Sequence, residues 1–232
     1  MVIIVPMRLV LFDIDGTLIR GGAGGRALRS ALLEIYALPA GNDGVRYDGK
    51  TDPRIVREIL SYHGQEDRFT DERVSSLFSL YLSYLREELT EGGDFKVLPG
   101  AHKLVRTLDR KEDFLLGLAT GNIEDGARLK LERGGLESFF SFGGFGSDAE
   151  DRTDLIRIAI ERGRQKNGHS QPEKSFVVGD TPRDIVHGKE AGADTLAVAS
   201  GNYSLDDLKS YKPDAAVESL QPIEPILEFL SS

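Results

Sequence analysis

The sequence predicts an α/β fold, in which a mostly parallel sheet forms the core and an all-helical segment is inserted into it. Short apolar runs alternate with amphipathic helical stretches, a pattern typical of βα units and a parallel sheet. A long stretch of helical pattern separates the first two apolar runs, and several apolar runs end directly in a polar residue. Ligands of such sheets bind beyond the carboxyl ends of the strands. Those polar residues are therefore the candidates for function.

Apolar runs at five places predict the strands of the core. The first three of these runs lead directly into Asp13, Thr120 and Asp180. A continuous apolar run that stops at a polar turn is typical of a buried parallel strand. The expected strands are Leu9–Phe12, Phe114–Ala119, Ser175–Gly179, Thr195–Ala199 and Ala215–Val217.

Between the first two strands, apolar residues recur at helical spacing, which predicts successive helices. Thr70 or Asp71 is the expected N-cap of the third helix. Glycine-rich stretches, RGGAGG and EGGDFKVLPG, flank the insertion and supply the backbone freedom of a hinge. We therefore expect residues 1–20 and 96–232 to form the core domain and residues 21–95 to form a helical cap domain. The expected apolar faces are Leu28, Leu32 and Ile35; Ile55, Ile59 and Leu60; and Val74, Leu77, Phe78, Tyr81 and Leu85.

The composition excludes several classes of function. A net charge of −9 over 232 residues argues against a nucleic-acid-binding protein, because such proteins cluster Lys and Arg on one surface. The absence of cysteine excludes disulfides, thiolate metal sites and a cysteine nucleophile, and it fits a cytoplasmic protein. The opening MVIIVPM is too short for a signal peptide, and Met7 is an alternative start to Met1. No apolar run reaches membrane-spanning length, and the composition indicates no particular oligomeric state.

Asp13-Ile14-Asp15-Gly16-Thr17 places two carboxylates at the end of the first strand. A solvated Asp-Gly turn is the simpler interpretation, while a calcium loop needs its glycine five positions after the first acid rather than three. The other strand ends carry Thr120-Gly121-Asn122, and Asp180 followed one helical turn later by Asp184. Each has a local explanation as a capping or turn residue. Together at three strand ends, they favour a metal and phosphate site.

These segments resemble the four motifs of the haloacid dehalogenase-like superfamily. In order, they are FDIDGTL, ATGN, a basic residue before an amphipathic helix, and GDTPRDI. The helical insertion after the first motif is similar to that family's C1 cap, and VLPGAHKLVRTL is similar to the segment that returns to the core. The resemblance implies a Rossmann-like sheet core, and it is greatest for the phosphoglycolate phosphatase-like subgroup.

The resemblance implies a Mg²⁺-dependent phosphatase that acts on small phosphate monoesters. Asp13 would be the nucleophile that forms an aspartyl-phosphate, and Asp15 would be the general acid and base. Thr120, with the Gly121–Asn122 turn, would bind phosphoryl oxygens. Mg²⁺ would be held by Asp13, the backbone carbonyl of Asp15 and Asp180, with Asp184 as a further or supporting ligand.

The third motif departs from the family pattern, in which a lysine is often followed by proline. Arg152 is the best candidate, because it precedes a helix with an apolar face formed by Leu155, Ile156, Ala159 and Ile160. Arginine can bind a phosphoryl oxygen, although its planar fork differs from an ammonium. A solvated arginine at a helix start is the alternative interpretation. Lys174 is the second candidate for the role.

Specificity in this family usually comes from the cap and from the loop after the first motif. Arg20, Arg46 and Lys50 lie in those regions and are candidates to bind an acidic group of the substrate, or else are solvated surface charges. The expected substrate is a phosphoglycolate-like ester or a sugar phosphate. The aromatic residues Phe78, Tyr81 and Tyr84 are interpreted as cap core rather than as a stacking surface.

Three other functions are alternatives to a phosphatase. A dehalogenase of this superfamily lacks the second aspartate, so Asp15 argues against it. A phosphomutase of the β-phosphoglucomutase type shares the phospho-aspartate and differs in returning the phosphoryl group to its substrate, so release of free phosphate separates the two. A phospho-acceptor module of receiver type is much shorter and has no helical insertion. The sequence therefore predicts an enzyme.

Overall fold

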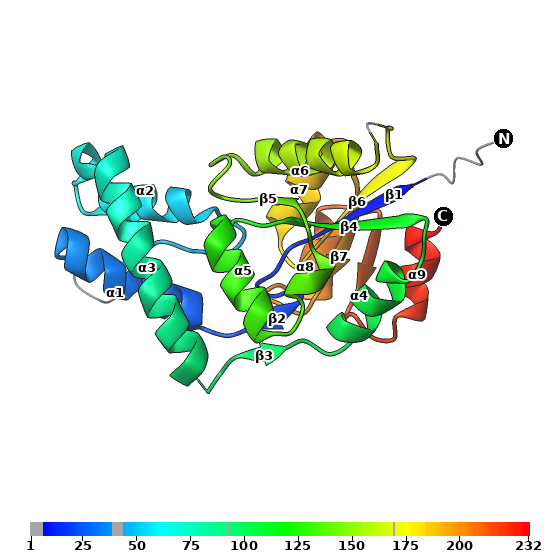
Figure 1. Ribbon diagram of the computed structural model, residues 1–232, viewed down its shortest axis with the longest axis horizontal. Coiled ribbons are helices and arrows are strands. Elements are labelled where there is room, and N and C mark those ends of the chain that lie inside the picture. Colours follow the sequence, from blue (N-terminus) through cyan, green and yellow to red (C-terminus); the bar gives the residue numbers. More distant parts are fainter. Residues whose placement is uncertain (1–6, 39–43, 92, 169) are drawn as a thin grey trace.

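The computed structural model describes residues 7–38, 44–91, 93–168 and 170–232. The segment before Met7, the alternative start, lies outside these ranges. Helices α1 (Ala23–Tyr36), α2 (Asp52–Tyr62) and α3 (Asp71–Glu91) gather at one end of the molecule (Figure 1). The sheet with its covering helices forms the other end. Within the described ranges, no helix combines the length and the apolar character needed to cross a membrane.

The core is a six-stranded sheet in the order β5-β4-β1-β6-β7-β8, and every neighbouring pair is parallel. The five predicted strands are confirmed, with ends that differ by at most one residue. The short strand β5 was not predicted, because two glycines carry no periodic signal. The bounds are β1 (Arg8–Phe12), β4 (Phe114–Ala119), β5 (Gly143–Gly144), β6 (Lys174–Gly179), β7 (Asp194–Val198) and β8 (Ala215–Val217).

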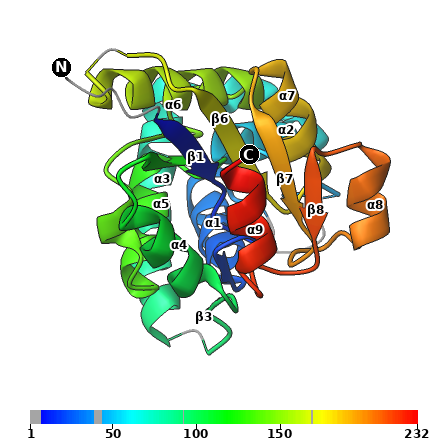
Figure 2. The ribbon, with the colours of Figure 1, turned by 90° about the vertical axis from the view of Figure 1, so that its right-hand side faces the viewer.

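Helices cover both faces of this sheet, since successive side chains of a strand point to opposite faces. Val10 and Phe12 pack in the cluster formed with α4, α5 and α9, whereas Leu9 and Leu11 pack in the cluster formed with α6. Figure 2 shows α6 and α7 on one side of the strands and α4 and α9 on the other. The helices are α4 (Ala101–Asp109), α5 (Glu124–Arg133), α6 (Arg152–Lys166), α7 (Pro182–Glu190), α8 (Leu205–Ser210) and α9 (Glu224–Leu230).

The insertion consists of α1 (Ala23–Tyr36), α2 (Asp52–Tyr62), a 3-10 turn (Glu66–Arg68) and α3 (Asp71–Glu91). Its helices bury a separate apolar cluster, with α1 packed along α3. The predicted faces form this cluster except for Val74, which is not part of it, and Ile35 and Phe78 are only half-buried. The fully buried members are Leu28, Leu32, Ile55, Ile59, Leu60, Leu77, Tyr81 and Leu85.

The two glycine-rich connections between insertion and core lie side by side. Strands β2 (Ile19–Arg20) and β3 (Lys96–Val97) pair antiparallel in a two-stranded ribbon. Just beyond it, the amide of Gly22 donates a 2.8 Å hydrogen bond to Asp94 Oδ2. The expected boundaries between core and cap, at residues 20/21 and 95/96, therefore lie at the β2–β3 ribbon.

Close backbone packing at Gly144 fixes α6 against the sheet. A Cβ atom at this position would lie 1.9 Å from the carbonyl oxygen of Leu155. The carbonyl of Gly144 also accepts a 3.0 Å hydrogen bond from the amide of Thr120. One glycine thus sets both the position of α6, which begins at Arg152, and the end of β4.

We predict that Gly144→Ala lowers the free energy of unfolding by about 1–3 kcal/mol, because the added methyl group must push α6 away from β5. Chemical denaturation monitored by circular dichroism measures the change. Gly93→Ala is the matched control, since no atom lies within 4 Å of its added Cβ. Equal stability of the two variants would contradict this account of the packing.

Candidate active site

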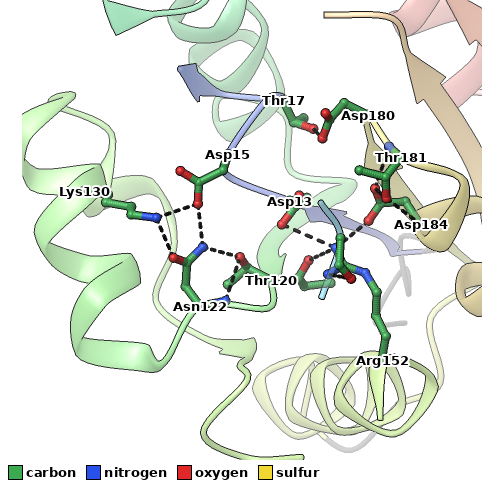
Figure 3. A network of polar contacts seen from close by, with 12 residues as sticks. Asp13, Asp15, Thr17, Thr120, Asn122, Lys130, Arg152, Asp180, Thr181 and Asp184 are labelled. Carbon is green, nitrogen blue, oxygen red and sulfur yellow. Dashed lines mark hydrogen bonds and ion pairs between the residues drawn. The ribbon is translucent and has the colours of Figure 1, made fainter. Parts of the chain in front are cut away.

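The three polar strand ends predicted from the sequence meet at one edge of the sheet. Asp13, Thr120 and Asp180 follow β1, β4 and β6, which are adjacent parallel strands. The amide of Asp13 continues the pairing of its strand by donating a 2.9 Å hydrogen bond to Val178. All three side chains are buried, and Figure 3 draws Asp13 between Thr120 and Asp180.

Two glycines enclose the carboxylate of Asp180. A Cβ atom on Gly16 or Gly201 would lie 2.2 Å or 1.6 Å from Asp180 Oδ2. Gly16 also has a φ of +89°, a conformation that L side chains rarely adopt. Thr17 directs its hydroxyl toward Asp180 Oδ1 at 3.4 Å. The turn after β1 therefore brings the backbone of Gly16 and the hydroxyl of Thr17 against the acid from β6.

Asp13, Asp180 and Asp184 form a buried cluster whose carboxylate oxygens lie within 4.8 Å of one another. Burial raises the pKa of Asp13 to about 7; Arg152 opposes the rise, while Asp184 and Asp15 add to it. Burial, with repulsion from Asp13 and Asp184, raises the pKa of Asp180 well above its ordinary value. Oxygen ligands and excess negative charge suit a hard divalent cation. The residues present therefore fit a divalent metal ion.

Arg152 lies inside this cluster rather than in solvent. It is 4% exposed, and its Nη2 atom lies 3.4 Å from Asp13 Oδ1 and contacts Asp184 Oδ1. Asp151 caps the helix by accepting a 2.8 Å hydrogen bond from the amide of Thr153. Burial disfavours the charged guanidinium, but Asp184 and Asp13 more than compensate, so the pKa of Arg152 is raised. Arg152 therefore supplies positive charge beside Asp13.

Asp184 is held from two sides by the protein. Its Oδ2 atom accepts hydrogen bonds of 2.9 Å from the amide and 2.7 Å from the hydroxyl of Thr181, as part of a capping box. Its Oδ1 atom contacts Arg152. Gly179 permits this approach, because a Cβ atom there would lie 2.1 Å from the carboxyl carbon of Asp184. The carboxylate thus orients Arg152 within the cluster.

The remaining cationic candidates lie in different places. Lys174 is at the opposite end of β6, 3.7 Å from Asp194, so it does not reach the site. Arg46 is exposed and does not line the cavity, whereas Arg20 and Lys50 do. The ammonium of Lys50 pairs with Glu58.

A cavity of 620 Å³ lies between the strand ends and the helical insertion. The segment before α2 closes over it. The amide of Asp52 donates a 2.8 Å hydrogen bond to the carbonyl of Gly121. Arg152 Nη1 donates a 3.2 Å hydrogen bond to the carbonyl of Gly49. A Cβ atom on Gly121 would lie 2.1 Å from the carbonyl oxygen of Lys50. Insertion and core therefore build the site together.

Sequence reasoning missed six charged residues of the cavity wall, namely Arg29, Asp48, Asp52, Asp94, Lys96 and Lys130. Lys130 is buried in α5, Asp52 begins α2, and Arg29 lies on α1. Burial raises the pKa of Asp52 to about 6, while Lys130 and the amide of Ile123 oppose the rise. Only Lys130 left a signal in the sequence, since it follows Gly126 and Ala127 at helical spacing on a buried face.

Comparison with known proteins gives consistent matches over nearly the whole chain. Residues 10–198 match the model of the haloacid dehalogenase-like hydrolase family. Pyrophosphatase PpaX from Oceanobacillus iheyensis is 26% identical, with 95% of this chain and 97% of that protein covered. Phosphoglycolate phosphatase from Aquifex aeolicus is also 26% identical, covering 96% of this chain and 100% of that protein.

Solved structures share the fold. A hydrolase from Pseudomonas syringae superposes with a TM-score of 0.72 at 21% identity, covering 98% of this chain and 100% of that one. The β-phosphoglucomutase from Clostridium difficile also gives 0.72, at 18% identity and 97% coverage of both chains. With the family model matching most of the sequence, the chain belongs to the haloacid dehalogenase-like hydrolase family and is an enzyme of its phosphatase type.

Proposed function

We propose that this protein is a Mg²⁺-dependent phosphatase that hydrolyses small organic phosphate monoesters through a phosphorylated Asp13. The observation that carries the proposal is the convergence of Asp13, Thr120, Arg152 and Asp180 at one edge of the sheet, facing a cavity. A cavity of 620 Å³ has the size of a small-molecule site. A cytoplasmic location stays a prediction from composition.

The chain's own residues account for both displacements of the reaction. A carboxylate oxygen of Asp13 attacks phosphorus, and the bond from phosphorus to the ester oxygen breaks as Asp15 donates a proton to that oxygen. Asp15 then takes a proton from water, whose oxygen attacks phosphorus and releases inorganic phosphate and the Asp13 carboxylate. Arg152 and Thr120 bind phosphoryl oxygens throughout.

The metal would be held by Asp13, Asp180 and the backbone carbonyl of Asp15, with Asp184 behind them as the residue that orients Arg152. When bound, Mg²⁺ supplies positive charge that offsets the charge of the phosphoryl group. This assignment is supported by the mutual repulsion of the buried carboxylates, which raises the pKa values of Asp13 and Asp180.

The cavity wall indicates a substrate with a second acidic group. Arg29 lines the cavity from α1, and no hydrogen bond or ion pair joins its guanidinium to any residue in the described ranges. Lys96 and Arg20 line the wall near the ribbon. Two relatives are named for pyrophosphate and for phosphoglycolate. Both compounds carry an anionic group beside the phosphoryl group that is transferred. We therefore favour a phosphoglycolate-like ester over a neutral sugar phosphate.

The first prediction is that Asp13→Asn abolishes turnover, with a loss of at least about a thousandfold, because the amide is not a nucleophile toward phosphorus. Phosphate release from a panel of esters, with Mg²⁺ and with EDTA, measures it. Asp109→Asn, an exposed change on α4, is the control. Activity of Asp13→Asn near the wild-type level would contradict the mechanism. Interconversion of bisphosphate sugars without phosphate release would instead indicate the phosphomutase.

The second prediction concerns stability against pH without metal. Because the pKa of Asp13 is about 7 when folded and 3.8 ordinarily, the folded state binds this proton more tightly. The contribution of Asp13 to the free energy of unfolding is therefore largest below pH 4 and declines as the pH rises to 7. Asp13→Asn should thus unfold at a higher temperature than wild type at pH 8, but not at pH 4. Thermal unfolding in EDTA measures the difference.

Added Mg²⁺ should raise the unfolding temperature of the wild type at pH 8 more than at pH 5, where protons compete for the carboxylates. The effect should be much reduced in Asp13→Asn. A stabilisation by Mg²⁺ that is equal in both proteins would show that the ion binds elsewhere.

The third prediction is that Arg29→Ala raises KM for phosphoglycolate by about tenfold, because a hydrogen-bonded charge pair is lost. The KM for an ester with a neutral alcohol group should change little. Arg86→Ala, an exposed change on α3, is the control. An equal rise of KM for both esters would contradict the assignment of Arg29 to a second acidic group.

A further inference from the structure

A buried lysine outside the four motifs contacts the proposed acid. Lys130, in α5, is 5% exposed, and its Nζ atom donates 2.6 Å hydrogen bonds to Asp15 Oδ2 and to Asn122 Oδ1 (Figure 3). An ammonium taken out of water needs such partners, so its placement is costly unless they are fixed. The pair joins α5 to the loops that follow β1 and β4.

The amide of Asn122 completes this arrangement. Its Nδ2 atom donates 2.8 Å hydrogen bonds to Asp15 Oδ2 and to Thr120 Oγ1. The ammonium of Lys130 has no acceptor to offer, so it can face only the carbonyl oxygen of the amide. Lys130 therefore fixes which way the Asn122 amide points, and both residues donate to the same oxygen of Asp15.

The two oxygens of Asp15 differ in their partners. In the described part of the chain, no residue donates a hydrogen bond to Oδ1, and the side chain of Asp15 is 44% exposed. Asp15 itself lines the cavity. An oxygen with two fixed donors is a poor site for a proton, while the oxygen without donors can carry one.

We propose that Lys130 is a positioning residue for the reaction, which with Asn122 holds Asp15 Oδ2 so that Oδ1 is the atom that exchanges the proton. In the first displacement Oδ1–H gives its proton to the ester oxygen as the bond from that oxygen to phosphorus breaks. In the second, Oδ1 takes a proton from the attacking water. This inference rests on the proposed phosphatase activity.

The helical insertion lies directly over the ammonium. A Cβ atom on Gly24, in the first turn of α1, would lie 2.9 Å from Lys130 Nζ and 3.7 Å from the hydroxyl of Tyr81. Gly24→Ala therefore displaces the ammonium from the opposite side without removing its charge. It provides a second way to disturb the position of Asp15.

The experiment compares kcat/KM for two esters. Phosphoglycolate releases an alkoxide, which needs a proton, whereas p-nitrophenyl phosphate releases a stable phenolate, which does not. Because kcat/KM reports on steps up to the first irreversible one, the second displacement does not obscure the comparison. Lys130→Met should lower kcat/KM by more than about thirtyfold for phosphoglycolate and less than about threefold for p-nitrophenyl phosphate.

Gly24→Ala should lower the same two values in the same order but by less, and Lys174→Met, at the far end of the sheet, should change neither. An equal loss for both esters in Lys130→Met would overturn the inference, because it would mean that the lysine binds the phosphoryl group or only supports the fold. A wild-type protein that hydrolyses neither ester would instead overturn the proposed function, and this inference with it.

Discussion

The structure depends on buried negative charge at the carboxyl ends of β1 and β6. Asp13, Asp180 and Asp184 lie within reach of a single ion, an arrangement that repulsion and desolvation oppose. Arg152 offsets part of this charge from the start of α6. Glycines hold these groups at fixed distances. Gly144 lets α6 pack closely on β5, and the glycines around Asp180 let the backbone approach its carboxylate.

The two ends of the cavity have different physical roles. At the strand ends, backbone hydrogen bonds and the parallel sheet fix the reacting groups rigidly. At the other end, side chains of the helical insertion line the cavity. The segment before α2 joins the two by bonding to Gly121 and Arg152. Movement of the insertion about the β2–β3 ribbon would therefore change both the access to the site and the surroundings of Arg152.

Much of the fold was predictable because its signals are local. Buried strands appear as apolar runs, so the five longer strands were expected within one residue. The insertion appears as helical periodicity, which predicted its helices and their apolar faces but not where each helix begins and ends. Strands β2, β3 and β5 were missed, because two-residue strands have no period and exist only through their partners. Asp13, Thr120 and Asp180 were expected to meet because parallel strands end at one edge. The three side chains lie next to one another only because β1 lies between β4 and β6 in the sheet.

The sequence by itself determined the chemical groups and the strand ends that carry them, since both are properties of short segments. It also singled out Arg152, although not its burial between two carboxylates. Only the tertiary structure decided that Lys130 contacts Asp15, that Arg29 faces the cavity, and that Lys174 and Arg46 do not. These facts depend on which helix covers which strand end, and residues far apart in the chain carry no local record of that packing.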